Sequence, residues 1–307
     1  MGTPEWAIPS LKAVIESGIE VNAVFTQPAR RVGRKKELTP SPVKQFALEQ
    51  NLSVHAPENA GSKDTLELVR AMSPELILVC AYGQILTQQF LDIPDIGCFN
   101  LHFSLLPSLR GASPVQTAIA SGLKTTGVSL QKIVLRLDSG PLAVCSEEIE
   151  ILQDDTTPTL GNRLSEVGAN LIRQNLQNIL EGNLNLTKQN ESKATYCGII
   201  KKGDGHVNWK EETAHEIERK LRAFFPWPGI YCFYKIKTKS DSRQRLQFTK
   251  AEIVQGNFEC GIIYPDMTIG AHTDGLKILS LRPEGKKEMD ADSFLRGNSE
   301  ILGTVLE

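Results

Sequence analysis

The amino-acid sequence predicts an α/β protein in two parts, a doubly wound parallel sheet followed by a small β-rich domain. Over roughly the first 180 residues, short apolar segments alternate with amphipathic segments of helical period, as in parallel sheets with crossover helices. From Tyr196 onward, short alternating strand-like segments take over, a pattern typical of small barrels. The length of 307 residues also suggests two domains. We therefore expect a Rossmann-like sheet domain and an OB-like β-barrel.

The patterning of apolar residues places the elements of the first part. Strands are predicted at residues 21–26, 53–55, 76–80, 126–135 and 142–149, and a further short strand ends at residue 102. Helices are predicted at residues 8–18, 62–72, 115–121 and 157–182, and a further helix starts at residue 42. Residues 183–195 are polar and lack periodicity. We therefore expect domains at residues 1–183 and 196–307, joined by a linker at 184–195.

The composition is that of an ordinary globular protein. Apolar residues make up 40% and charged residues 23% of the chain, and the longest apolar run, Leu76–Ala81, is too short to span a bilayer. No charged-then-apolar leader opens the sequence, so we expect a cytoplasmic protein. The six cysteines are dispersed without a metal-binding spacing, which favours reduced thiols. The net charge of −2 gives no overall argument for nucleic acid.

The stretch from Cys98 to Arg110 carries the clearest chemical signal. Asn100 and His102 stand at alternate positions where an apolar strand ends, so their side chains emerge on one face of the sheet. Open α/β sheets bind ligands at this edge. An amide beside an imidazole can bind a carbonyl and stabilise the oxyanion that it becomes. The alternative interpretation is that both side chains are polar groups satisfied within a turn.

The residues that follow extend this signal into a long motif. The pattern N-L-H-x-S-L-L-P-x-x-R-G, residues 100–111, resembles the signature of the folate-dependent formyltransferases. The resemblance covers nearly the whole chain. Three further segments, at residues 26–44, 225–228 and 281–287, resemble the branch of this family that formylates methionyl initiator tRNA.

The resemblance implies a reaction and its residues. The formyl donor would be 10-formyltetrahydrofolate, and no metal would be required. Asn100 and His102 would hold the formyl oxygen, and Asp138, 36 residues beyond His102, would orient or charge-stabilise His102 and help a proton move through water. By itself, the sequence at residues 138–141 predicts only a β-turn. Folate would contact the loop residues Ser104, Leu105, Leu106 and Pro107, together with Tyr82 and Gly83.

Two basic segments stand out in a chain of nearly balanced charge. The resemblance assigns both to tRNA, through Arg30, Arg34, Lys35 and Lys36 in the first and Lys235, Lys237, Lys239, Arg243 and Arg245 in the second. The alternative is that they are solvated surfaces. Phe224, Phe225 and Trp227 could stack on bases, but aromatic residues between prolines are expected to pack in a core.

The chain departs from the family pattern in two places. Family members begin with a strand before the Gly2-Thr3-Pro4 turn, so the first strand is missing here, and we expect that the start of the protein was assigned too late. Family members often carry an acidic residue and a glycine just before the aspartate, where this chain has Val134 and Arg136. Three rival functions follow: formylation of a small amine such as a sugar nucleotide, hydrolysis of formyltetrahydrofolate, and non-catalytic RNA binding. No protein partner is evident, and we expect a monomer.

Overall fold

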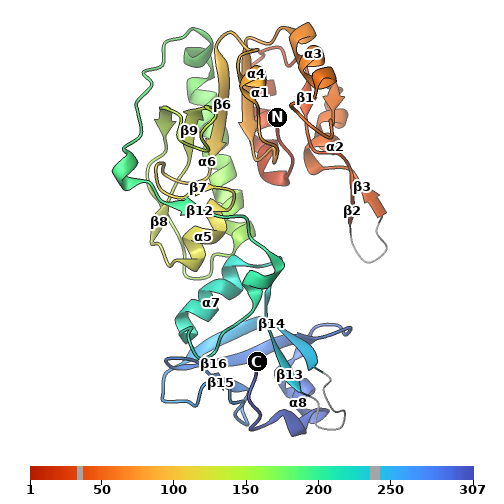
Figure 1. The fold of residues 1–307 in the computed structure, drawn as a ribbon, viewed down its shortest axis with the longest axis vertical. Helices are drawn as coiled ribbons and strands as arrows, with labels where there is room; N and C mark the ends of the chain where they lie inside the picture. Colours follow the sequence, from red (N-terminus) through yellow and green to blue (C-terminus); the bar gives the residue numbers. More distant parts are fainter. Residues whose placement is uncertain (33–36, 236–242) are drawn as a thin grey trace. The chain divides into compact units, whose positions relative to one another are not determined.

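The computed structural model describes residues 1–32, 37–235 and 243–307, which form two compact units (Figure 1). Unit 1 comprises Met1–Pro114, Thr125–Glu150 and Leu160–Gly198, and unit 2 comprises Val115–Lys124, Ile151–Thr159 and Ile199–Glu307. The chain therefore crosses between the units more than once. The segment expected as a linker, residues 184–195, belongs to unit 1.

The main sheet of unit 1 has four strands in the order β10-β9-β6-β5. These strands are β5 (Leu76–Cys80), β6 (Gly97–His102), β9 (Ser129–Lys132) and β10 (Leu142–Cys145). β5 and β6 are parallel, as are β1 (Val24–Phe25) and β4 (Val54–His55) in a separate pair. The expectation of a parallel sheet is wrong for β9 and β10, which run antiparallel to their neighbours. A short turn at residues 133–141 joins β9 to β10, and such a short connection allows only antiparallel pairing.

The first two residues lie between the β1–β4 pair and the main sheet of unit 1. The Gly2 amide donates to the Phe25 carbonyl at 3.0 Å, and the Cys80 amide donates to the Met1 carbonyl at 2.9 Å. Met1 and Gly2 thus connect β1 to β5 through backbone hydrogen bonds. A Cβ at Gly2 would lie 2.6 Å from the Ala7 Cβ and 2.9 Å from the Cys80 carbonyl oxygen, so only glycine fits there.

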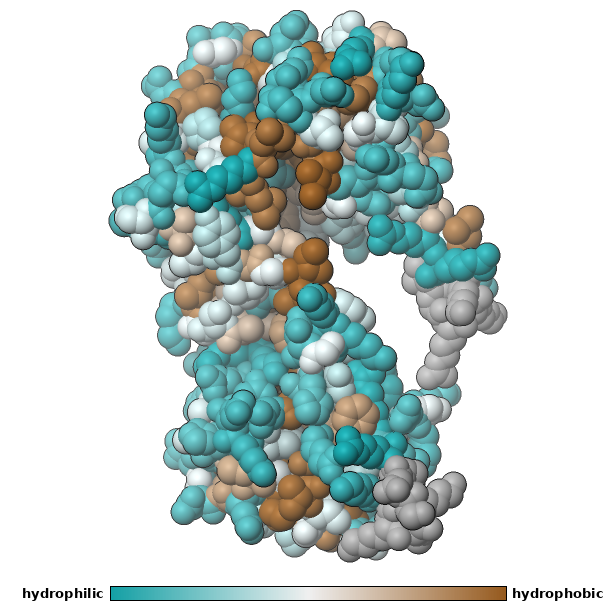
Figure 2. All heavy atoms as spheres, in the orientation of Figure 1, coloured by the Kyte–Doolittle hydropathy of each residue, from teal (hydrophilic) through white to brown (hydrophobic). Residues whose placement is uncertain are grey.

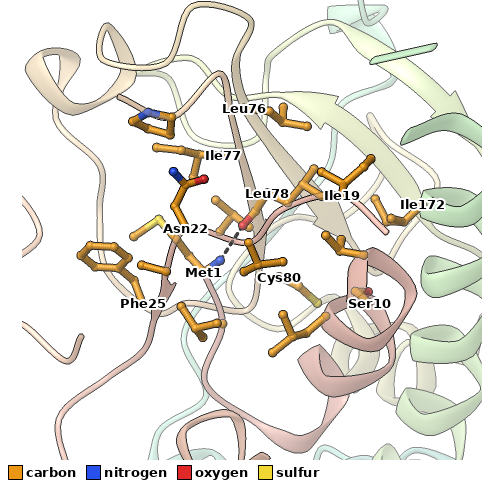
Figure 3. Close-up of a pocket in the computed structure, with 18 of the residues that line it drawn as sticks. Met1, Ser10, Ile19, Asn22, Phe25, Leu76, Ile77, Leu78, Cys80 and Ile172 are labelled. Atoms are coloured by element: carbon orange, nitrogen blue, oxygen red, sulfur yellow. Dashed lines mark hydrogen bonds between the residues drawn. The ribbon is translucent and has the colours of Figure 1, made fainter. Parts of the chain in front are cut away.

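An apolar pocket lies beside Met1 (Figure 3). Side chains from α1, β1, β5, α6 and the segment between α1 and β1 line it, among them Ile19, Leu76 and Ile172. The Met1 α-amino group donates to the Leu78 carbonyl at 2.6 Å. Burial lowers the pKa of this amino group to about 6.

The helices begin where the sequence supplies caps. These helices are α1 (Ile8–Glu16), α2 (Pro42–Glu49), α3 (Lys63–Met72), α4 (Gln88–Leu91), α5 (Pro114–Ala120) and α6 (Thr157–Leu180). The Ser41 and Ser62 hydroxyls accept hydrogen bonds from the third residues of α2 and α3. The helices predicted near these positions are confirmed, and Gly182, at φ +69°, follows α6 as expected of a helix stop. All six cysteines lie in the described part of the chain, and none of them forms a disulfide bond.

Short strands complete unit 1. They are β2 (Arg30–Val32), β3 (Glu37–Thr39), β7 (Arg110–Gly111), β8 (Thr125–Thr126), β11 (Ile149–Glu150) and β12 (Tyr196–Cys197). β2 and β3 form an antiparallel pair inside the basic segment, and β7 pairs with β12 in parallel. The strand predicted at residues 126–135 is shorter in the structure, because residues 133–141 form the turn between β9 and β10. Single-turn 3₁₀ segments lie at Glu5–Ala7 and Glu191–Lys193.

Unit 2 is built on an antiparallel sheet of order β13-β14-β16-β15, with β17 paired to β16. Its elements are α7 (Ala214–Ala223), β13 (Ile230–Lys235), β14 (Arg243–Val254), β15 (Thr268–Gly270), β16 (Gly275–Pro283), β17 (Met289–Asp290) and α8 (Ala291–Arg296), with 3₁₀ segments at Lys202–Gly205 and Ser299–Ile301. The carboxyl-terminal residues 303–307 bond to Phe233 of β13 and to residues 261–263, which bond in turn to β15. Backbone hydrogen bonds therefore link the two edges of the sheet.

Two aromatic residues of unit 2 do not pack as expected. Phe224 is buried, but Phe225 and Trp227 are 50% and 58% exposed. The core prediction is wrong for these two, because they lie in the turn after α7 and not in an element. Among the residues that the structure describes, no helix is both long and apolar enough to cross a membrane.

Candidate active site

His102 lies at the carboxyl end of β6 and is held by its main-chain neighbour. Its ring is buried, and Nε2 lies 2.8 Å from the Leu109 carbonyl oxygen. Because a carbonyl can only accept, Nε2 carries the proton of this hydrogen bond. Nδ1 then faces the carboxylate of Asp138, with 3.7 Å between Nδ1 and Oδ2. The anchored ring therefore presents one specific nitrogen to the aspartate.

Asp138 lies in the turn that follows β9, and two hydrogen-bond donors fix its carboxylate. Its Oδ1 accepts from Gln131 Nε2 at 2.8 Å, and its Oδ2 accepts from the Gly111 amide at 2.8 Å. Gly111 has φ +124°, and a Cβ there would lie 2.0 Å from the Cys197 carbonyl oxygen. Glycine is thus required for β7 to lie against β12 while its amide reaches Asp138.

Asn100 completes the group predicted from the sequence. It is partly exposed on β6, two residues before His102, and its register partner on β9 is Gln131. Within the described residues its side-chain amide makes no hydrogen bond. The structure thus brings the amide, the imidazole and the carboxylate to one end of β6, and leaves the amide available for a ligand.

The loop predicted to hold folate is attached to β9 through hydrogen bonds to Ser129. The Ser129 hydroxyl accepts from the Leu106 amide at 3.0 Å and donates to the Ser104 carbonyl at 2.8 Å. These main-chain groups of the Ser104–Pro107 loop are therefore already bonded. Leu105 is partly buried and Leu106 is buried.

The second predicted folate loop, at Tyr82 and Gly83, follows β5. The Tyr82 carbonyl accepts from Thr3 Oγ1 at 2.8 Å and Gln27 Nε2 at 3.3 Å. The Tyr82 ring is buried, which raises its pKa to about 12, and its hydroxyl has no partner among the described residues. Gly83 adopts φ +83°.

Exposed apolar side chains border these loops, and the sequence analysis missed them. Ile85 follows Gly83 and is 87% exposed, while Leu135 and Leu137 precede Asp138 and are 62% and 61% exposed. Figure 2 shows apolar side chains gathered on one face of unit 1. The available signal was the presence of large apolar residues in loops beside the motif residues.

A buried charge lies one residue before Gly111. The Arg110 side chain has no exposed surface, and its Nη2 lies 2.8 Å from Glu191 Oε1. The hydrogen bond from Arg110 holds the pKa of Glu191 below its usual range, and the same bond raises the pKa of Arg110. Arg136, flagged as a departure from the family pattern, also pairs with Glu191 at 3.1 Å. Val134 is partly exposed in the same turn.

The predicted tRNA-binding residues are only partly placed. Arg34, Lys35, Lys36, Lys237 and Lys239 lie outside the described residues. Arg30 donates to Gln27 Oε1 at 3.0 Å. Lys235 and Arg243 both pair with Glu307, each at 2.9 Å, while the Arg245 guanidinium lies 3.9 Å from the centre of the Tyr231 ring. One carboxylate therefore pairs with two of these cations.

No group of His, Cys, Asp and Glu side chains suited to a metal ion occurs in the described ranges.

Comparison with family models gives the class. The formyl transferase model matches residues 1–176, and the model of the formyl transferase C-terminal domain matches residues 199–299. The chain therefore belongs to the formyl transferase family.

Within the family, the chain is similar over its whole length to methionyl-tRNA formyltransferases. It is 37% identical to the enzyme of Caldanaerobacter subterraneus subsp. tengcongensis, with 100% of this chain and 98% of the relative covered. It is 38% identical to that of Macrococcus caseolyticus, with 99% and 96% covered.

Two solved structures share the fold at low identity. The sugar 3N-formyl transferase WlaRD superposes with a TM-score of 0.63 at 19% identity, covering 93% of this chain and 97% of that one. HypX from Aquifex aeolicus in complex with tetrahydrofolic acid has a TM-score of 0.59 at 16% identity, covering 92% of this chain and 48% of that one.

Proposed function

We propose that this chain transfers the formyl group of 10-formyltetrahydrofolate to the α-amino group of methionyl initiator tRNA, giving the N-formylated product used to start translation. The observation that carries the proposal is the convergence of Asn100, His102 and Asp138 in a chain similar over its full length to methionyl-tRNA formyltransferases. The chain acts as a monomer in the cytoplasm.

The folate substrate supplies the formyl carbon and leaves as tetrahydrofolate. Two features of this chain fit such a ligand. Gly83 brings no side chain into the loop after β5, and Ile85, Leu135 and Leu137 expose apolar surface beside the site. Leu105 and Pro107 extend the rigid loop that begins at Ser104. Flat aromatic ligands bind sites of this kind, with apolar walls and a few polar groups.

The oxygen of the reacting formyl group is held by side chains of β6. As the amine attacks the formyl carbon, that oxygen gains negative charge, and donors fixed in place before the reaction stabilise it. The Asn100 amide is such a donor, because no group of the described chain occupies it. His102 donates through Nδ1 once that nitrogen is protonated, since Nε2 is already bonded to Leu109.

Asp138 takes part in the proton transfer from the amine to the folate nitrogen. The amine that attacks must lose a proton, and the folate nitrogen that leaves must gain one. The carboxylate lies 3.7 Å from His102 Nδ1, so it stabilises the protonated imidazole, accepts the amine proton through water and passes it on through water to the folate nitrogen that leaves. Gln131 and Gly111 keep it in that position.

The two units divide the remaining tasks. The sheet unit is a Rossmann-like domain, in which Met1 and Gly2 connect the β1–β4 pair to the main sheet, and the Ile199–Glu307 part of unit 2 is an OB-like barrel. The basic residues of both parts contact phosphates of the tRNA, at Arg30, Arg34, Lys35, Lys36, Lys235, Lys237, Lys239, Arg243 and Arg245. The exposure of Lys235 and Arg243 supports this assignment.

Separate assays with three different formyl acceptors test the proposal against its rivals. Labelled 10-formyltetrahydrofolate is supplied with methionyl initiator tRNA, an amino-sugar nucleotide, or water alone. We expect transfer to the charged tRNA, falling steeply with added salt. Equal transfer to the sugar, or release of formate without an amine, would favour the small-amine or hydrolase alternative. Failure with all three would favour non-catalytic RNA binding.

A further inference from the structure

Gln189 lies in a segment that the sequence marks only as a linker, yet its side chain contacts the active-site turn. Its Nε2 donates to the Gly140 carbonyl at 2.7 Å and to the Asp138 carbonyl at 2.9 Å, with Gln131 Oε1 at 3.3 Å. Its Oε1 accepts from Arg110 Nε at 3.0 Å and Nη2 at 2.8 Å. One amide thus links the catalytic turn to a buried arginine.

The chemistry of these neighbours permits one orientation of the Gln189 amide. Arginine can only donate hydrogen bonds, and main-chain carbonyls can only accept them. The amide oxygen must therefore face Arg110, and the amide nitrogen must face the turn. No other common side chain of this length offers an acceptor on one side and two hydrogens on the other.

The Asp138 turn needs such support. Asp138 has φ +48°, a conformation that residues with a Cβ rarely adopt without surrounding constraint. The turn is also pressed against β9, since a Cβ on Gly140 would lie 1.7 Å from the Lys132 carbonyl oxygen. Gln189 binds the carbonyls on both sides of the Asp138–Gly140 turn, so it fixes the backbone from which the carboxylate projects.

The anchor of Gln189 is itself rigid. Arg110 has no exposed surface and is bonded to both oxygens of Glu191. The backbone of the segment is also attached to the sheet, because Thr187 and Leu142 exchange hydrogen bonds at 2.8 and 2.9 Å. Both the backbone near Gln189 and the arginine that its side chain contacts are thus held in place.

We propose that Gln189 is a positioning residue for formyl transfer, holding the Asp138 turn so that the carboxylate faces His102. It does not touch substrate and acts only through Asp138. This inference rests on the proposed function of the same site and adds a residue 51 positions along the chain from the aspartate that it serves.

The test uses the full chain with Gln189→Met, which keeps the size of the side chain and removes both kinds of hydrogen bond. Gln174→Met is the matched control, because Gln174 is exposed on α6. We expect kcat to fall by about 10- to 100-fold for Gln189→Met, as for other small displacements of catalytic groups. KM for both substrates should stay within about twofold, and the control should match wild type.

A second readout does not depend on activity. The imidazole of His102 is titrated by NMR in wild type, Gln189→Met and Asp138→Asn. If Gln189 acts through Asp138, the titration midpoint of Gln189→Met moves from the wild-type value toward that of Asp138→Asn. Adding Gln189→Met to Asp138→Asn should then change the midpoint no further.

Each result decides the proposal. A wild-type midpoint in Gln189→Met overturns it, whatever the change in kcat, because a structural role alone can lower activity. A further shift in the double variant also overturns it. If wild type fails to formylate methionyl initiator tRNA while the NMR shifts follow the expected pattern, the positioning role stands and the proposed substrate falls.

Discussion

The residues of the site differ in how many of their side-chain hydrogen-bonding groups are already bonded within the chain. His102 is held through Nε2 and Asp138 by two donors, whereas the Asn100 amide has no partner in the described chain. The residue that is least engaged in the folded chain is therefore the one most available to the reacting oxygen. Its loss should affect catalysis far more than stability.

Asn100→Ala tests this separation. We expect kcat to fall by about 10²- to 10³-fold, the usual effect of removing one oxyanion donor. The free energy of unfolding should change by less than about 0.5 kcal/mol, because no internal hydrogen bond is lost. Steady-state kinetics and urea unfolding measure the two quantities, with Asn178→Ala on the exposed face of α6 as control. A variant with normal kcat would remove Asn100 from the mechanism.

The sequence could predict these residues to different degrees. Asn100 and His102 follow from strand alternation and an adjacent loop motif, both of which are local. Asp138 could be found only through its spacing in a known family, because the turn at residues 138–141 is ordinary. Gln189 could not be found, since its contacts with Arg110 span 79 positions and depend on the folded path of a polar segment.

At the scale of elements, the pairing of β7 with β12 brings the Gly111 amide to Asp138. Gly111→Ala would place a methyl group 2.0 Å from the Cys197 carbonyl oxygen at φ +124°. We expect a loss of about 3 kcal/mol or more in the free energy of unfolding, together with lower kcat. Gly182→Ala is the matched control, because Gly182 has φ +69° and no atom within 4 Å of its Cβ position.

The control isolates the backbone penalty from the clash. It should cost only about 1 kcal/mol, measured by the same urea titration. Equal losses at the two glycines would mean that the β7–β12 contact does not constrain Gly111, and the account of how Asp138 is held would then be wrong.

Strand order shows the limit of prediction for elements. The alternation of strands and helices correctly predicted β5, β6 and the helices around them. It did not predict that β9 and β10 run antiparallel, because apolar patterning carries no strand direction. The short turn that contains Asp138 decides that direction.

Across the whole molecule the net charge is only −2, but charged residues form local clusters. In unit 2, Glu307 holds both Lys235 and Arg243. Glu307→Gln should free these cations for phosphate, so tRNA affinity should rise at low salt and the slope of log affinity against log salt should steepen by about 1. Filter binding at several salt concentrations measures the slope.

Glu211→Gln controls for the change in net charge, since Glu211 is exposed elsewhere on unit 2. If both variants change the slope equally, the effect is one of total charge. Lys235 and Arg243 would then not form part of the tRNA surface.

The arrangement of unit 2 could be predicted only in outline. Short alternating strands indicated a barrel, but the contact between its edges uses the chain terminus at residues 303–307 and the segment at 261–263. Neither segment has a strand pattern of its own. Two-residue contacts between distant segments leave almost no periodic signal.

The most direct test of the account is formyl transfer from labelled 10-formyltetrahydrofolate to methionyl initiator tRNA by wild type and His102→Ala. We expect wild type to formylate the tRNA and His102→Ala to lose at least about 10²-fold in kcat. Transfer by His102→Ala at the wild-type rate would contradict the role of the β6 terminus in the reaction.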